Sequence, residues 1–96
     1  MRNRYLVCYD IADPKRLRRI FKTLEGYGDH LQYSVFSCDL SRKEKALLLD
    51  ALLGHFNRKE DSLLMIDLGP ANGDARERFT FFGQGLRPVE EDTFII

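Results

Sequence analysis

On either side of Asp10, a strand pattern is followed closely by the pattern of a capped helix, and this pair restricts the possible folds more than any other part of the sequence. Residues 5–9 form a short apolar run of strand-favouring types, typical of a central strand covered on both faces, and Asp10 ends it. Asp13 is a favoured N-cap type, and Pro14 suits the first helical position because its missing N–H costs nothing there. The chain is therefore expected to begin with a strand and a helix.

This first helix is predicted to have two opposite faces. One face carries apolar residues at i, i+3, i+4 and i+7, up to a glycine stop near Gly28, and they are Leu17, Ile20, Phe21 and Leu24. The opposite face carries Lys15, Arg18, Arg19 and Lys22, with Arg16 beside them. Such a face suits a phosphate backbone, since Arg and Lys neutralise phosphates without base contacts. It is equally compatible with a merely solvated helix surface.

Local sequence patterns also predict the strands and the helix in the middle of the chain. Residues 30–40 favour β-structure but exceed one ordinary strand, so we expect two short strands with a tight turn near Tyr33 and Ser34. Ser41 and Glu44 then form a capping box that opens a second helix. Its apolar positions are Leu48, Leu49, Leu52, Leu53 and Phe56.

The remaining signals complete a known order of elements. Residues 63–68 predict a fourth strand, residues 69–74 form a turn-rich break, and residues 78–82 predict a further strand. The order strand, helix, strand, strand, helix, strand is the ferredoxin-like βαββαβ pattern of the α+β class. It predicts one domain over residues 1–96, with an antiparallel sheet and two helices on one face.

The end of the chain, residues 85–96, is unusual because an acidic run leads to an apolar terminus. That terminus consists of Phe94, Ile95 and Ile96. An unsupported terminus is normally polar and frayed, so these residues are expected to pack on something. We interpret the segment as a dimerisation tail that forms a short strand with a second protomer. Packing in a groove of its own chain remains the alternative.

Charge and cysteine content narrow the class of protein. The net charge is zero, but residues 1–45 hold ten Lys/Arg against six Asp/Glu, whereas residues 46–96 hold five against nine. Any site for a polyanion is therefore expected near the first helix. Cys8 and Cys38 lack CxxC spacing, and no secretory or transmembrane-length segment is present, which indicates a cytoplasmic protein with reduced, buried thiols and no membrane partner.

Asp10 can be interpreted in two ways. An aspartate after a strand is commonly a turn former or cap, but this position can also reach an open cleft. Mg²⁺ takes oxygen ligands, commonly one or two carboxylates together with substrate phosphates, and one aspartate per chain is too few. A twofold dimer would bring two copies together. His30 and His55 lack zinc-ligand neighbours, and no residue pattern supports a covalent nucleophile.

The combination of motifs resembles a known family. The matching pieces lie between residues 5 and 40: Tyr9-Asp10-Ile11 with Asp13, Lys15-Arg16, Leu24, Tyr27-Gly28, Gln32, and Ser34-Val35-Phe36. They resemble the signature of the small CRISPR-associated adaptation proteins, the second core Cas family, whose members are commonly described as endoribonucleases. Overall length and strand order agree along the whole chain.

The resemblance implies a ferredoxin-like homodimer that acts on RNA or DNA. Asp10 matches the family aspartate that, with its symmetry mate, is proposed to bind one shared Mg²⁺, and Tyr9, Ser34 and Phe36 would line that cleft. Nucleic acid would contact the basic side chains of the first helix together with His30. The sequence departs from the family at His30-Leu31 and Ser37-Cys38, where basic and acidic residues are common.

Three functions remain open at this point. The first is a metal-dependent endonuclease that takes part in CRISPR spacer acquisition as a homodimer, with Asp10 as its catalytic and metal-binding residue. The second is a non-catalytic DNA-binding scaffold that bridges subunits of the Cas integrase. An effector-binding regulator shares the fold, but no residue pattern supports a small-molecule pocket.

Overall fold

The computed structural model describes residues 1–72, 79–80 and 82–83. Within them the chain forms four strands and two helices in the predicted order. Their bounds are β1 Asn3–Asp10, α1 Pro14–Glu25, β2 Asp29–Gln32, β3 Val35–Leu40, α2 Arg42–Leu53 and β4 Ser62–Pro70. The ferredoxin-like prediction is thereby confirmed.

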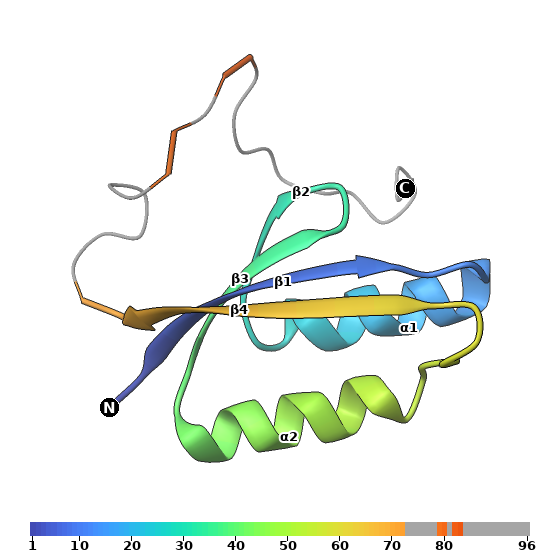
Figure 1. Ribbon diagram of the computed structural model, residues 1–96, viewed down its shortest axis with the longest axis horizontal. Helices are drawn as coiled ribbons and strands as arrows, with labels where there is room; N and C mark the ends of the chain where they lie inside the picture. The colour runs from blue at the N-terminus through green and yellow to red at the C-terminus, as the bar shows by residue number, and fades with distance from the viewer. Residues whose placement is uncertain (73–78, 81, 84–96) are drawn as a thin grey trace.

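The four strands form one antiparallel sheet in the order β2-β3-β1-β4 (Figure 1). Each helix joins two parallel strands that are separated by a third strand. Such crossovers are almost always right-handed, which places both helices on the same face of the sheet. Register pairs Val7 with Phe36 of β3 and with Met65 of β4, so these residues share the face that the helices cover.

Both helices begin where the local sequence signals predict. The Asp13 side chain accepts a hydrogen bond from the Arg16 backbone N–H, and Pro14 is the first residue of α1. At the start of α2, Ser41 and Glu44 form the complete capping box. Helix α1 ends at Glu25, slightly before the predicted stop.

The glycine at position 28 has a different role from the predicted helix stop. A Cβ atom at this position would collide with the carbonyl oxygen of Ser37 and the Sγ of Cys38. Glycine therefore allows the chain to approach β3 closely as it enters β2. The predicted tight turn follows β2, and Tyr33 adopts a positive φ of 31° there.

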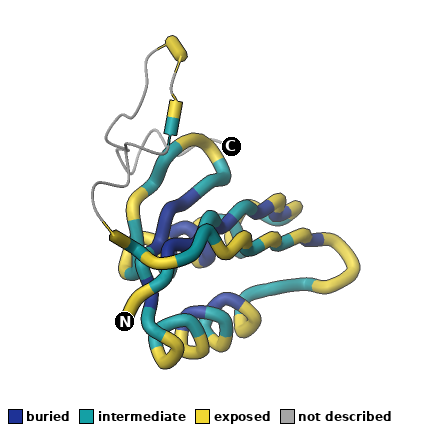
Figure 2. Tube along the Cα trace, turned by 60° about the vertical axis from the view of Figure 1, so that its left-hand side comes forward, coloured by how far each residue is buried: buried dark blue, intermediate teal, exposed yellow. Residues whose placement is uncertain are grey.

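The apolar core lies between the sheet and the helices, and Figure 2 marks in dark blue the buried positions of the strands and helices. On the other side of the sheet the buried residues are polar, with Arg4 3% and Ser37 8% exposed. The buried side chains include Tyr5, Val7, Tyr9, Ile20, Phe21, Leu24, Phe36, Cys38, Leu40, Leu48 and Leu52. Leu6 and Cys8, between them on β1, are only half-buried. Among the described residues, the expectation that β1 is covered on both faces is therefore met only in part, because both helices lie on one side. The side without helices is the uncovered face of the sheet.

Other expectations also need correction. Leu53 is 47% exposed, and Phe56 lies beyond the end of α2 while still packing on the core. Phe79, Thr80 and Phe82, the described residues of the predicted strand at 78–82, are not in a strand, and residues 78 and 81 lie outside the described residues. The predicted dimerisation tail, including Phe94, Ile95 and Ile96, lies outside the described residues.

Candidate functional site

Asp10 is the last residue of β1, and its side chain is exposed. Because alternate residues of a strand point to the same face, Asp10 shares the uncovered face of the sheet with Leu6 and Cys8. Its register partner on β4 is Ser62. Within the described part of the chain, the Asp10 carboxylate takes part in no hydrogen bond or ion pair. It is therefore free to bind a cation or an incoming donor.

The loop that follows Asp10 is held by a buried carboxylate that the sequence had not singled out. Asp61 lies directly before β4, and its side chain is fully buried. Its Oδ1 accepts hydrogen bonds from Ala12 N at 3.0 Å and Arg16 Nη2 at 3.0 Å. Its Oδ2 accepts from Arg16 Nε at 2.8 Å and Asn57 N at 2.9 Å. One carboxylate thus joins the β1–α1 loop, helix α1 and the α2–β4 connection.

This network determines the ionisation of both partners. The paired hydrogen bonds from the Arg16 guanidinium hold the pKa of Asp61 well below its usual range, and the backbone N–H groups of Ala12 and Asn57 act in the same direction. The same bonds raise the pKa of Arg16, helped by Glu60. Both groups are therefore charged at neutral pH, and their charges offset each other.

Arg16 must accordingly be separated from the other basic residues of α1. Its guanidinium binds Asp61 and also Glu60, whose Oε1 lies 3.0 Å from Nη2. The expectation that Arg16 contacts nucleic acid conflicts with this arrangement, because its charge is already neutralised by two carboxylates. Arg16 instead fastens α1 to the segment before β4.

The other basic residues of α1 lie as predicted on its outward side. Lys15, Arg18, Arg19 and Lys22 are all exposed. In the described ranges none of the four forms an ion pair with a carboxylate. Their charges are therefore available to a polyanion, as the sequence pattern predicts for a phosphate-binding face.

His30 does not join this basic face. It lies on β2 opposite Phe36, on the side of the sheet that the helices cover. Its ring packs at centroid distances of 5.1 Å from Phe21 and 5.0 Å from Phe36, and its Nε2 contacts the Tyr33 carbonyl oxygen. His30 was predicted to contact nucleic acid, but the strand register places it half-buried at the edge of the core.

Two of the three predicted cleft residues are core residues instead. Phe36 is fully buried and Tyr9 is 5% exposed, because odd-numbered positions of β1 and their register partners face the helices. Burial raises the pKa of Tyr9 above its usual range, and its hydroxyl has no hydrogen-bond partner among the described residues. Ser34 lies beside the end of β1, since its carbonyl oxygen accepts a hydrogen bond from Tyr9 N at 3.1 Å, and its role in lining a cleft stays a prediction.

The described residues do not surround Asp10 with a set of metal ligands. Among residues 1–72, 79–80 and 82–83, no three His, Cys, Asp or Glu side chains are close enough together to hold a metal ion. A lone exposed carboxylate fits Mg²⁺ only as one of several oxygen ligands. With the described residues alone, a metal centre at Asp10 would need ligands from a second copy of the chain or oxygens from a substrate.

None of the described helices is long and apolar enough to span a membrane.

Comparison with known proteins places the chain in a family. The model of the family described as "CRISPR associated protein Cas2" matches residues 2–74. A protein of Rhodospirillum rubrum named CRISPR-associated endoribonuclease Cas2 1 is 41% identical over 92 residues, which are 96% of this chain and 89% of that protein. The CRISPR-associated endoribonuclease Cas2 of Geobacter sulfurreducens is 36% identical over 96 residues, the full length of both chains.

Solved structures agree with this assignment. A crystal structure of a Cas2 protein superposes with a TM-score of 0.74 at 28% identity, covering 94% of this chain and 97% of that one. The structure of Streptococcus pyogenes Cas2 at pH 6.5 superposes with a TM-score of 0.69 at 29% identity, covering 83% and 99%. The resemblance seen in the sequence motifs is thereby confirmed, and the chain belongs to the Cas2 family of CRISPR-associated proteins.

Proposed function

We propose that this protein is a metal-dependent endonuclease that hydrolyses phosphodiester bonds of RNA or DNA and takes part in CRISPR spacer acquisition as a homodimer. Its Rhodospirillum and Geobacter relatives are named as endoribonucleases, which supports nuclease chemistry. The observation that carries the proposal is the free, exposed carboxylate of Asp10, at the end of a central strand and shortly before the cationic helix α1.

The uncovered face of the sheet supports the dimer. It presents Leu64, which is 54% exposed, and Ile66, which is 39% exposed, beside the half-buried Leu6 and Cys8. Apolar residues gathered on one side of a sheet are typical of a surface that another protein covers. In a twofold contact through this face each residue would approach its own copy or a near neighbour, which would bring the two Asp10 carboxylates toward one another.

Two Asp10 carboxylates would then hold Mg²⁺, completed by water and by phosphate oxygens of the substrate. When bound, such an ion polarises the scissile phosphate and lowers the pKa of a coordinated water. The chain itself supplies three further contributions. Asp61 holds the loop after Asp10, the basic residues of α1 attract the nucleic-acid backbone, and Ser34 borders the end of β1.

The test compares wild type with Asp10→Ala and Asp10→Asn in cleavage of RNA and DNA oligonucleotides, with Mg²⁺ and with EDTA. Cleavage should require Mg²⁺ and fall by at least 100-fold in both variants, while affinity for the nucleic acid is retained. Sedimentation of the same samples should show a dimer. Cleavage that persists unchanged in Asp10→Ala would exclude the assignment of Asp10 as catalytic, and a strictly monomeric protein would exclude the shared metal.

A second function is favoured by what surrounds Asp10. Within the described residues of one chain, Asp10 belongs to no group of three His, Cys, Asp or Glu side chains that could hold a metal ion. The protein could then serve as a non-catalytic, DNA-binding scaffold that bridges subunits of the Cas integrase. An integration assay with purified integrase distinguishes the two functions: a scaffold predicts normal spacer integration with Asp10→Ala, and reduced integration when the α1 charges are removed.

A further inference from the structure

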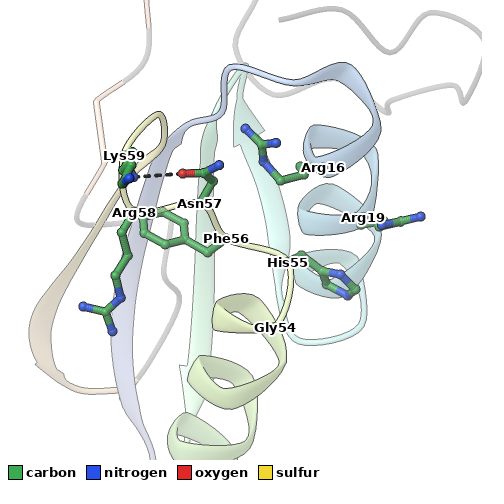
Figure 3. Close-up of a pocket in the computed structure, with 8 residues that line it drawn as sticks. All are labelled: Arg16, Arg19, Gly54, His55, Phe56, Asn57, Arg58 and Lys59. Atoms are coloured by element: carbon green, nitrogen blue, oxygen red, sulfur yellow. Dashed lines mark hydrogen bonds between the residues drawn. The ribbon is translucent and has the colours of Figure 1, made fainter.

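The α2–β4 connection carries basic residues that the sequence patterns did not relate to α1. An open groove of about 690 Å³ lies where this connection passes α1 (Figure 3). Its lining residues come from both segments and are Arg16, Arg19, Gly54, His55, Phe56, Asn57, Arg58 and Lys59. The groove is therefore bordered by the N-terminal half of α1 on one side and by residues 54–59 on the other.

The charge balance around this groove is positive. The two acidic residues that follow it, Glu60 and Asp61, are both bound by Arg16. Arg19, Arg58 and Lys59 are exposed and form no ion pair with a carboxylate in the part of the chain that the structure describes. Because Arg16 occupies the nearby acids, these three cations are left for an external anion.

The connection is also held in one shape. The Asn57 N–H donates to Asp61 Oδ2 at 2.9 Å, and the Asn57 side chain accepts from Lys59 N at 2.9 Å (Figure 3). The Asn57 carbonyl oxygen accepts from Asp61 N at 2.8 Å. A segment ordered in this way presents Arg58 and Lys59 with little loss of backbone freedom when a ligand binds.

The arrangement of the side chains indicates the kind of anion. In Figure 3, Arg19 extends outward from α1 and His55 lies beside α1, whereas Arg58 extends from the opposite end of the connection, next to Lys59. A ligand that contacts both sides must carry several negative charges along its length. A nucleic-acid backbone has this property, since phosphates repeat along each strand.

The groove offers little to read base identity. Phe56, the one phenyl ring among the lining residues, is partly buried and packs against the core. The exposed groups are cations, which bind phosphates and carry no sequence information by themselves. Contacts here should therefore fix where the backbone runs without selecting a sequence.

We propose that this groove is a second backbone-binding surface, in which Arg58 and Lys59, with His55, extend the cationic face of α1 across the α2–β4 connection. The proposal rests on the nucleic-acid binding inferred above, but it does not depend on catalysis at Asp10. It assigns the path of the nucleic acid past α1, toward the end of α2.

The test removes two positive charges at each end of α2. The groove variant is Arg58→Gln with Lys59→Gln, and the matched control is Arg42→Gln with Lys43→Gln, whose residues are exposed at the start of α2. Both variants change the net charge equally. Affinity for a labelled duplex and for a labelled single-stranded RNA is measured between about 50 and 200 mM salt, where phosphate contacts dominate.

The groove variant should bind about tenfold more weakly than wild type, and its slope of log affinity against log salt should flatten by about 0.9 for each phosphate that the protein no longer neutralises. The control should keep the wild-type slope. The proposal that the groove binds the backbone would be overturned if the salt slope were equal in the two variants, or if it were unchanged from wild type in the groove variant. Arg58→Gln alone, expected to give a smaller flattening, provides the same decision if the double variant fails to fold.

The two proposals fail in different ways. If cleavage depends on Asp10 and Mg²⁺ but the salt slope of the groove variant is unchanged, the nuclease proposal is kept and the groove proposal is rejected. If the slope flattens but Asp10→Ala does not affect cleavage, the groove proposal is kept and the nuclease proposal is rejected.

Discussion

The two faces of the sheet are made of the same strands and similar residue types, yet they differ in how they are covered. On the face toward the helices, Val7 and Phe36 are fully buried. On the opposite face, Leu64 and Ile66 are 54% and 39% exposed, although they are adjacent in sequence to the partly buried Leu63 and Met65. Apolar character alone therefore does not say which face is the core; the position of the helices does.

The apolar residues of the two faces also stabilise different states of the protein. Residues on the covered face stabilise the single chain, because folding removes them from water. On the uncovered face, Leu64 and Ile66 gain less from folding, and their exposed apolar surface can contribute only when another surface covers it. Substitutions on the two faces should consequently affect different measurements, which tests this distinction directly.

The largest effect is expected on the covered face. Phe36→Ala should lower the free energy of unfolding by about 3 to 5 kcal/mol, because it removes a fully buried ring that contacts Phe21 and Tyr9. Urea denaturation at low protein concentration measures the change. Leu47→Ala, at a half-exposed position on α2, is the control and should cost about 1 kcal/mol or less. Equal losses in the two variants would contradict the assignment of Phe36 to the core.

The next largest effect is expected for Asp61→Ala, which should lower the free energy of unfolding by roughly 2 to 4 kcal/mol. The change leaves Ala12 N, Asn57 N and the Arg16 guanidinium without their hydrogen-bond acceptor. Glu60→Gln removes only the exposed partner of Arg16 and should cost less than about 1 kcal/mol.

The contribution of Asp61 also predicts a pH dependence. Its folded pKa is depressed, so its stabilisation is fully present above the unfolded pKa of about 4 and is lost as pH falls through that value toward the folded one. Urea denaturation at a series of pH values should show wild type and Asp61→Ala converging in acid. A constant difference between them below pH 4 would count against the ion pair.

On the uncovered face, Leu64→Thr with Ile66→Thr should change the unfolding free energy of the single chain by less than about 1 kcal/mol, since threonine suits strands and little burial is lost. The same change should weaken self-association strongly, as measured by sedimentation. Leu47→Gln with Leu53→Gln alters two similarly exposed leucines on α2 and should leave association unchanged. If only the α2 variant dissociates, the dimer uses another surface.

The two cysteines provide the mildest test. Burial raises the pKa of the Cys38 thiol to about 12, with Asp29 and Asp39 adding to the effect, whereas Cys8 is half-buried on the uncovered face. A maleimide at pH 8 should therefore modify Cys8 first, as mass spectrometry can measure, and Cys8→Ala should react very slowly. Modification of Cys8 should slow at protein concentrations that favour the dimer. Preferential labelling of Cys38 would contradict the assignment of the faces.

Much of the fold could be predicted because its signals are local. Asp13 with Pro14, and Ser41 with Glu44, start helices through hydrogen bonds that span only a few residues. The turn at Tyr33 was predicted from strand length. For the candidate site, the exposure of Asp10 and of the outward α1 cations followed equally from their neighbours in the chain.

Other features depended on contacts between residues distant in sequence. Arg16 and Arg19 are the same residue type on the same helix, but Arg16 forms an ion pair with Asp61, which lies 45 residues away in the sequence. Asp61 itself could have been recognised only by knowing that the segment before β4 lies beside the β1–α1 loop. His30 and Phe36 were expected at a binding surface, but the strand register placed both of them among core aromatics.

Spacing along a few turns or one strand is enough to derive the order of elements, the caps, the cationic outer face of α1 and the acidic end of β1. Contacts across the fold were needed to show which face of the sheet the helices cover, which arginine of α1 is paired with carboxylates and which basic residues share a groove. Those outcomes depend on strand register and helix packing, and they bring together side chains whose separation along the chain carries no local signal.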